Sequence, residues 1–396
     1  MSSIRCIPTA TTPIDLQDFS YSVFHSSGGL ERFKHDINEY LGSTQSQTST
    51  SFMRAIYLCL KILCKNDARK GIIIPRFSCP TFAHAILAAG LDIQYCDTDP
   101  ATLSIDINSL NQMNFETILA IIVVNHQGLA NPMDELVKLA KKHNVFLIED
   151  IGYSFGTEYK NKKLGSIGDF AVLNFKEGKS IPIGGGMITV NGEKSNFEKA
   201  EPKLKKSNIG RLLAYKYIIN PYFYSLFKKS MNFMHINGKR MFTSEDTIRN
   251  STNEYDYEFN YDMPLYEISD FQGAMGSTIL SKINKYIQIR RKNAEYLESE
   301  LKNCKNITLI KKESGVNLVH YIRYCILVQN NKRDLLLKEL EKGGIEASAI
   351  YPEVRPDPEK FPGAFVVSDQ ILTLPCHPGI NDRDLNKIVH IIRTFA

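Results

Sequence analysis

The chain has 396 residues and a mass of 44.9 kDa, and its residues are 43% hydrophobic and 23% charged. These proportions are ordinary for a globular protein and exclude collagen-like, intrinsically disordered and disulfide-scaffold classes. The 48 basic and 43 acidic residues leave a formal charge of +5, which is too small to indicate nucleic-acid binding without a local concentration of charge.

Between residues 51 and 190, short apolar runs alternate with stretches rich in helix formers. Strands are expected at 71–75, 92–96, 118–124, 145–148 and 187–190, and helices at 53–63, 81–89 and 132–143. Continuous β-branched runs that alternate with helices predict a parallel sheet covered on both faces. Ligands of such a sheet lie at the carboxyl ends of its strands. That rule places residues 75–81, 125–128 and 149–154 around one crevice.

Residues 201–262 interrupt this rhythm, because they are rich in Tyr, Phe, Lys and Asn. A substrate lid, a dimer arm or a membrane-surface patch would fit this cationic, aromatic insert, but an exposed helical hairpin is favoured. A long helix is expected over 268–301, followed by a smaller α+β unit. The sequence therefore predicts a large α/β domain at 1–262 and a small C-terminal domain at 263–396.

The eight cysteines show no CxxC spacing, and most lie in apolar runs. They predict reduced core thiols rather than a disulfide framework or a metal site. The N-terminus lacks the apolar stretch of a signal peptide, and no window holds about 18 consecutive apolar residues. We therefore expect a cytoplasmic protein with no membrane span, no metal and no nucleic-acid partner.

Two strand ends carry the residues of greatest chemical interest. One strand delivers Glu149 and Asp150 to the expected crevice, and Lys179 follows a later strand, ahead of the glycine-rich turn 184–186. Taken singly, a strand-end Asp can cap the next helix and a Lys near a turn is a common surface feature. Together they supply what pyridoxal phosphate needs. The carboxylate keeps the pyridine nitrogen protonated, and the amine forms a Schiff base.

Further motifs follow in a fixed order across about 330 residues. They are Ile72-Ile-Ile-Pro75 with 76–79, Asp97-Thr-Asp99, Val123-Val-Asn-His-Gln-Gly128, Ile148-Glu-Asp150, Gly165-Ser-Ile-Gly-Asp169, Asn174-Phe-Lys-Glu-Gly-Lys179, Gly184-Gly-Gly186, 268–274, Arg290-Arg291, Gly344-Ile-Glu346 and 372–378. In these motifs the chain resembles the DegT/DnrJ/EryC1/StrS family of sugar aminotransferases, which are fold type I pyridoxal-phosphate enzymes.

The resemblance implies a large three-layer α/β/α domain with a mostly parallel sheet, a smaller C-terminal α+β domain, and a homodimer. It also implies transfer of an amino group from an amino acid, most often L-glutamate, to a keto-sugar linked to a nucleotide, as in amino-sugar and polysaccharide or antigen biosynthesis. Lys179 would form the Schiff base and move the proton, and Asp150 would pair with the pyridinium nitrogen.

The resemblance also suggests how the cofactor is held. Ser51 and Arg54 open an early helix, whose N-terminus offers free N–H groups to a phosphate, so both are phosphate candidates. A plain N-cap for Ser51 and a solvated helix face for Arg54 remain alternatives. Asn174 stands where the family has a phosphate-binding Ser, and it can still donate a hydrogen bond. His126 would contact the ring or substrate, or be a neutral structural histidine.

The chain departs from the family pattern at several positions. Tyr153 replaces a Gln or His, and its hydroxyl would reach the cofactor's phenolate oxygen unless the ring only packs. Leu265 and Glu267 stand where the family has an Asn and an Arg that contact the phosphate across the dimer interface. Two alternatives stay open: altered chemistry on the same cofactor, as a dehydratase, lyase or bond-forming enzyme, or a non-catalytic sensor. Lys179 argues against the relatives that carry His there and dehydrate the sugar.

Overall fold

The computed structural model describes residues 5–65, 67–192, 203–204, 209–226 and 266–395. Leu265 and most of the predicted insert at 201–262 therefore lie outside the described residues. The boundary predicted between 262 and 263 falls there too, so the division into domains stays a prediction.

The helices occur at α1 Leu16–Phe24, α2 Gly29–Leu41, α3 Phe52–Leu63, α4 Pro80–Ala88, α5 Ile107–Asn111, η1 His126–Gly128, α6 Met133–His143, α7 Ile209–Ile218, α10 Asp270–Ser281, α11 Ile283–Leu301, α12 Arg333–Lys342, α13 Pro362–Gln370 and α14 Asp382–Phe395. The strands occur at β1 Gln45–Ser49, β2 Gly71–Pro75, β3 Asp92–Cys96, β4 Ile118–Val124, β5 Phe146–Asp150, β6 Glu158–Tyr159, β7 Lys162–Lys163, β8 Phe170–Asn174, β9 Gly186–Val190, β10 Lys203–Leu204, β11 Tyr266–Glu267, β12 Ile307–Leu309, β13 Val316–Leu318, β14 Arg323–Val328 and β15 Ile371–Pro375.

The largest sheet is mostly parallel. Within the described residues its strands run in the order β1-β9-β8-β5-β4-β2-β3. The pairs among β3, β2, β4, β5 and β8 are all parallel, whereas β9 runs antiparallel to both β8 and β1. The carboxyl ends of β2, β4, β5 and β8 therefore share one edge, where the sequence predicts the crevice.

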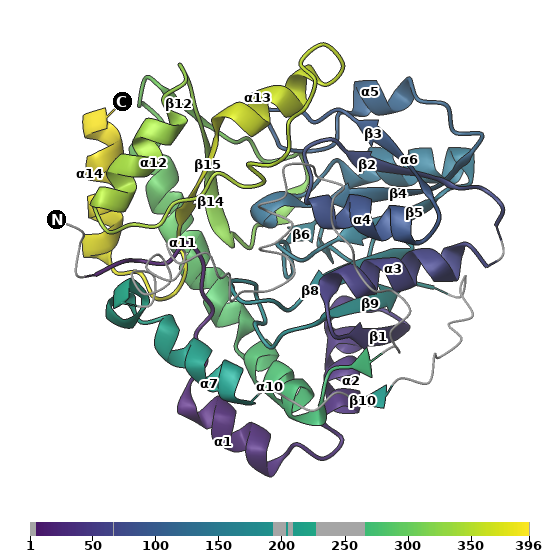
Figure 1. Ribbon diagram of the computed structural model, residues 1–396, viewed down its shortest axis with the longest axis horizontal. Helices are drawn as coiled ribbons and strands as arrows, with labels where there is room; N and C mark the ends of the chain where they lie inside the picture. Colours follow the sequence, from purple (N-terminus) through teal and green to yellow (C-terminus); the bar gives the residue numbers. More distant parts are fainter. Residues whose placement is uncertain (1–4, 66, 193–202, 205–208, 227–265, 396) are drawn as a thin grey trace, which may run out of the picture.

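Both faces of this sheet are buried, as its continuous apolar runs predict. In β4, Ile121 and Val123 pack with α2, α6 and α10, whereas Ile122 and Val124 pack with α3 and α4. Because successive side chains of a strand point to opposite faces, a strand covered on both sides must be apolar throughout. The three layers can be followed in Figure 1, where α3 and α4 cover one face of the sheet.

The C-terminal unit has its own antiparallel sheet and its own core. Strand β14 lies between β12 and β15, and α11, α12 and α14 pack against them. In Figure 1 this unit is light green to yellow and lies beside the large sheet. The start of the chain joins it, because Ile7 pairs with Ile345 and belongs to the same core. The predicted smaller α+β unit is therefore present.

The long helix predicted over 268–301 is wrong, because the chain forms two helices there. Lys282 ends α10 and precedes α11, with φ −98° and ψ −2°. Its amine forms ion pairs with Asp15 and Asp18 of the α1 region, at 2.7 and 2.6 Å. The break separates α10, which packs in the core of the large sheet, from the end of α11, which packs in the C-terminal core.

The two units lie close together after β4. Gly128 has φ +102°, and a Cβ atom there would lie 2.2 Å from the carbonyl oxygen of His320. Only glycine fits this position, because it lacks a Cβ and tolerates a positive φ. The turn that follows β4 therefore lies directly against the segment that leads into β14. No helix in the described part of the chain is long and apolar enough to cross a membrane.

Candidate active site

The two carboxylates at the end of β5 have different environments. Glu149 is fully buried and accepts backbone N–H groups from Gly165, Ile167 and Gly168, at 2.7 to 2.8 Å. These hydrogen bonds hold the turn before β8 in place, so the carboxylate of Glu149 has a structural role. Asp150 is the next residue and so points to the other side of the strand. The structure thus separates a structural carboxylate from one that is available for chemistry.

The two carboxylate oxygens of Asp150 differ in their partners within the described residues. Its Oδ1 accepts the N–H of Gly152 at 2.8 Å, and within the described residues its Oδ2 has no hydrogen-bond partner. Burial raises the pKa of Asp150 to about 6, against the opposing effects of the Gly152 N–H and the charge of Lys179. A buried carboxylate with a free oxygen and a raised pKa is well suited to pair with a cation brought by a ligand.

Lys179 is buried in the same place. Its Nζ lies 2.8 Å from the centroid of the Tyr153 ring. Burial lowers the pKa of the Lys179 amine, while Tyr153 and the charge of Asp150 oppose this shift. A lowered pKa leaves more of the amine neutral near pH 7, which is the form that attacks a carbonyl group. The charges of Asp150 and Lys179 each shift the pKa of the other, so the two predicted residues lie within electrostatic range of one another in the buried interior.

Three aromatic rings form a wall beside them. The ring of Tyr351 lies 5.4 Å from that of Phe77 and 6.0 Å from that of His126. Burial lowers the pKa of His126 to about 4, so this histidine is neutral. Its Nε2 lies 3.0 Å from the carbonyl oxygen of Phe77, which can only accept, so Nε2 carries the proton. Its Nδ1 is buried and has no partner among the described residues.

The predicted phosphate candidates lie near the end of β8. Asn174 pairs with Gly186 across β8 and β9, and a Cβ on Gly186 would lie 2.8 Å from Cα of Phe52, the first residue of α3. A Cβ on Gly152 would lie 3.0 Å from Cβ of Asn174 and 3.1 Å from Oδ1 of Asp150. The N-terminus of α3, Asn174 and Asp150 therefore follow one another along the same edge of the sheet.

The side chains in this group differ in which hydrogen-bond donors they have left for a ligand. The hydroxyl of Ser51 accepts the N–H of Arg54 at 3.2 Å, so Ser51 is an N-cap and still has its own hydrogen to donate. The Oδ1 of Asn174 accepts the N–H of Lys176, which leaves its amide hydrogens for a ligand. Arg54 is buried, so the alternative of a solvated helix face is wrong.

The carboxylate of Glu267 is engaged in contacts within the protein. It forms an ion pair with Lys34 at 2.7 Å and accepts hydrogen bonds from the backbone and the hydroxyl of Thr48. It therefore does not take over the phosphate contact that an arginine makes at this position in the resembling proteins. Leu265, the other departure in that segment, lies outside the described residues.

Arg323 is a residue that the sequence does not single out. It is the first residue of β14, its Nε is buried without a hydrogen-bond partner, and within the described residues it forms no ion pair. Its positive charge adds to the lowering of the pKa of Lys179 by burial and opposes the raising of the pKa of Tyr351 by burial, so it lies within electrostatic range of both. The sequence does contain one signal for Arg323, because a charged residue is unusual in an otherwise apolar strand.

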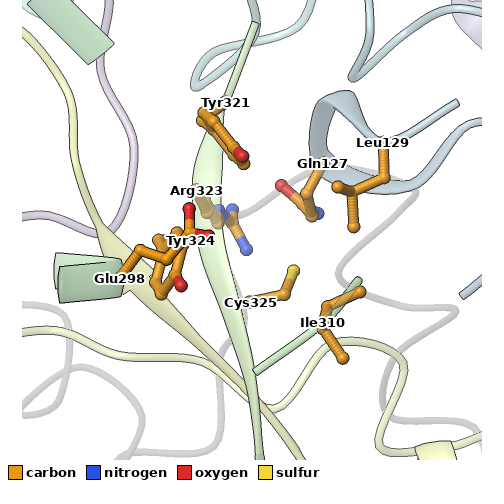
Figure 2. Close-up of a pocket in the computed structure, with 8 residues that line it drawn as sticks. All are labelled: Gln127, Leu129, Glu298, Ile310, Tyr321, Arg323, Tyr324 and Cys325. Atoms are coloured by element: carbon orange, nitrogen blue, oxygen red, sulfur yellow. The ribbon is translucent and has the colours of Figure 1, made fainter. Parts of the chain in front are cut away.

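A small cavity of about 10 Å³ adjoins Arg323, with Gln127 on its opposite side (Figure 2). Gln127 is fully buried, and neither polar atom of its amide has a hydrogen-bond partner among the described residues. A cavity of this size holds about one water molecule. A larger ligand must therefore approach Arg323 from another side.

The family can now be assigned. A model of the DegT/DnrJ/EryC1/StrS aminotransferase family matches residues 21–216 and 225–393. This chain therefore belongs to the DegT/DnrJ/EryC1/StrS aminotransferase family, as its motifs predict.

Relatives with named activities match most of the chain at low identity. GDP-perosamine synthase of Caulobacter vibrioides is 22% identical over an alignment 416 residues long, gaps included. The alignment covers 98% of this chain and 98% of that protein. GDP-4-keto-6-deoxy-D-mannose 3-dehydratase of Yersinia pseudotuberculosis is 24% identical over 341 residues, covering 83% of this chain and 78% of that protein.

A solved structure shows the same fold. A putative sugar aminotransferase of Streptococcus pneumoniae, in its PLP form, superposes with a TM-score of 0.76 at 17% identity, covering 98% of both chains. Together with the observed layers, this similarity confirms the predicted fold type I architecture.

Proposed function

We propose that this protein is a pyridoxal-phosphate-dependent aminotransferase that transfers the amino group of an amino acid, with L-glutamate as the expected donor, to a nucleotide-linked keto-sugar. The observation that carries the proposal is the meeting of Asp150 and Lys179 in one buried site, although Asp150 ends β5 and Lys179 lies on the loop after β8. Membership of an aminotransferase family supports the reaction class. Names of relatives, including GDP-perosamine synthase, support a sugar nucleotide as the acceptor.

The residues present fit the cofactor at both of its ends. The free Oδ2 of Asp150 suits a protonated ring nitrogen, and Lys179 supplies an amine for the aldehyde. The N–H groups at the start of α3, the hydroxyl hydrogen of Ser51 and the amide of Asn174 are donors suited to a phosphate. Nδ1 of His126 is an acceptor, and Tyr153 lies beside Lys179, so both are candidates for contacts with the ring.

When bound, pyridoxal phosphate supplies an electron-withdrawing ring that accepts the electrons released as a proton leaves the α-carbon of the amino acid. The protein's part follows from its own groups. Asp150 would keep the ring nitrogen protonated by charge pairing, and burial would strengthen that pairing. Nζ of Lys179 would take the proton from the α-carbon of the amino acid and hold it within the buried site for the next transfer. The buried wall of Phe77, His126 and Tyr351 helps to exclude water.

The proposal extends to the assembly and setting of the enzyme. We infer a homodimer and a cytoplasmic location, together with the large and small domains predicted from the sequence. A homodimer would let a second copy supply phosphate contacts that Glu267 does not make here. Gel filtration with light scattering measures the oligomeric state directly.

The half-reaction with the amino donor tests the proposal. Protein loaded with cofactor is mixed with L-glutamate, and the 2-oxoglutarate released is compared with the amount of protein. We expect one equivalent, and adding a keto-sugar nucleotide should then permit repeated turnover, with the amino sugar identified by mass spectrometry. Release of water from the sugar, without gain of nitrogen, would instead support the dehydratase alternative. No release of keto acid with any amino acid would contradict transamination.

Arg323 gives a prediction about the amino donor. As a half-buried cation without an ion pair among the described residues, and within range of Lys179, it is suited to bind the donor's carboxylate. Arg323→Gln should raise KM for L-glutamate about 10–100-fold, the effect of losing a hydrogen bond between charged groups. KM for the keto-sugar should not change. Arg291→Gln, which removes a partly exposed arginine paired with Glu295, is the control, and an equal KM in both variants would refute the assignment.

A further inference from the structure

A continuous path of hydrogen bonds connects Lys179 to a buried arginine on α11. The hydroxyl of Thr12 donates to the backbone carbonyl of Lys179 at 2.8 Å. The same hydroxyl oxygen accepts a hydrogen bond from Nη2 of Arg290 at 2.8 Å. Thr12, Arg290 and Lys179 are all buried. The path therefore links three segments that are far apart in the sequence and runs where water does not compete.

The direction of the bonds depends on the arginine. A guanidinium group can only donate, so it occupies a lone pair of the Thr12 hydroxyl. The hydroxyl hydrogen is then available for the carbonyl of Lys179, which can only accept. An acceptor in place of Arg290 would draw this hydrogen away. The arginine thus fixes both the position and the orientation of the hydroxyl group that holds the backbone of Lys179.

Arg290 lacks the usual compensation for a buried charge. It is fully buried, and within the described residues it pairs with no carboxylate. Its other acceptors are the carbonyl oxygens of Thr11 at 2.6 Å and Ile322 at 3.1 Å. Burial lowers the pKa of Arg290 to about 10, so it remains charged at neutral pH. An unpaired buried cation costs stability, and an apolar side chain would fill the same volume more cheaply.

The backbone around Lys179 needs such support. Gly178, just before it, has φ +81°, and the N–H of Lys179 closes a turn by donating to the carbonyl of Lys176 at 3.1 Å. Lys179 therefore lies on a loop after β8, where its backbone lacks the ladder of bonds that fixes a strand. Thr12 supplies a fixed point on the carbonyl side of the residue whose amine must reach the cofactor.

We propose that Arg290 is a positioning residue for Lys179 and acts through the Thr12 hydroxyl. The inference deepens the proposed function, because it assigns residues that hold the reacting amine in its buried place. The competing explanation is that Arg290 only joins the N-terminal segment to the start of β14, through Thr11 and Ile322. The two explanations differ in what the Thr12 hydroxyl does for the amine.

Adjacent threonines provide a matched pair of variants. Thr12→Val removes the hydroxyl in the path, whereas Thr11→Val removes a hydroxyl that lies 3.0 Å from Nδ1 of His377. Both threonines are buried, and both substitutions preserve shape. A third variant, Arg290→Lys, keeps the charge but loses the planar fork that reaches Thr11, Thr12 and Ile322 together.

The reactivity of Lys179 can be measured without cofactor. Cofactor-free protein is treated with a small acylating reagent across a pH series, and peptide mass spectrometry compares labelling of Lys179 with that of Lys176. Burial is the largest cause of the lowered pKa of Lys179, and Tyr153, Asp150 and Arg323 are the groups whose charges act on it. A loosened loop would let water reach the amine, so its pKa should rise toward the ordinary value.

We expect the midpoint of Lys179 labelling to rise by about half a unit in Thr12→Val and Arg290→Lys, which lowers labelling about threefold at a fixed pH below the midpoint. Thr11→Val should match the wild type, and all three should be checked for folding by thermal unfolding. Equal labelling profiles in Thr12→Val and Thr11→Val, both folded, would overturn the proposal. The assay requires no transamination, so a protein that shifts as expected but releases no keto acid would refute the proposed function alone.

Discussion

Lys179→Ala should lower turnover by at least about 1,000-fold, because the proton transfer by a positioned base alone contributes about 10²–10⁴-fold. The amine is the group that the site buries and brings close to Asp150, and Ala offers nothing to replace it. The variant should also lose the visible absorption that depends on a covalent link between cofactor and protein. Turnover and an absorption spectrum of the purified variant with added cofactor measure both effects.

Lys176→Ala is the matched control, since Lys176 lies in the same turn and its backbone carbonyl accepts the N–H of Lys179. Truncating its side chain leaves that backbone bond intact. The control should retain the absorption band. If Lys179→Ala keeps the band as well, the amine that reacts with the cofactor is not Lys179, and the assignment fails.

Asp150→Asn should lower kcat by about 10²–10³-fold, the usual effect of removing one preorganised electrostatic group. Asn is almost the same size but carries no charge to stabilise a protonated ring nitrogen. The ring then accepts electrons less readily, so the step that removes the α-proton should slow. The slower step should show a larger kinetic isotope effect with glutamate deuterated at the α-carbon, because proton removal becomes rate-limiting.

Glu149→Gln provides the contrast one residue away. Its carboxylate accepts three backbone N–H groups, so the substitution should lower the free energy of unfolding by about 1.5–3 kcal/mol, the range for hydrogen bonds to a charged group. Asp150→Asn should leave stability nearly unchanged. Chemical denaturation and kcat measured on both variants separate the two roles. A loss of stability without loss of kcat in Asp150→Asn would show that Asp150 belongs to the fold rather than the chemistry.

Much of the large sheet could be predicted from the sequence, because its strands are buried on both faces. Strands β2, β3 and β4 occupy the predicted residues. In β2 and β4 the reason is a continuous apolar run, which has few other stable environments. The secondary structure at the start of the chain was harder to predict. Helices α1 and α2 and strand β1 were not predicted, because their burial depends on packing against α10 and β9.

The candidate site, too, could be predicted from the sequence only in part. Asp150 and Lys179 could be selected from the sequence because each follows an apolar strand, and the parallel ends of those strands meet at one edge. The sequence could not show that Glu149 is held by the backbone while Asp150 keeps a free oxygen. That distinction depends on which side of β5 each residue faces, and on the turn at 165–168 that folds back beneath it.

The sequence by itself therefore determined the family, the layered architecture and the pair of residues expected to do the chemistry, because these depend on local patterns and on motifs in a fixed order. Only the tertiary structure decided how Lys179 is held, which cation lies within electrostatic range of its amine, and where the helix predicted at 268–301 breaks. Thr12 lies 167 residues from Lys179, and Arg290 lies 278 residues from Thr12. Hydrogen bonds over such separations leave no periodic signal in a sequence, because they form only after the two units have packed together.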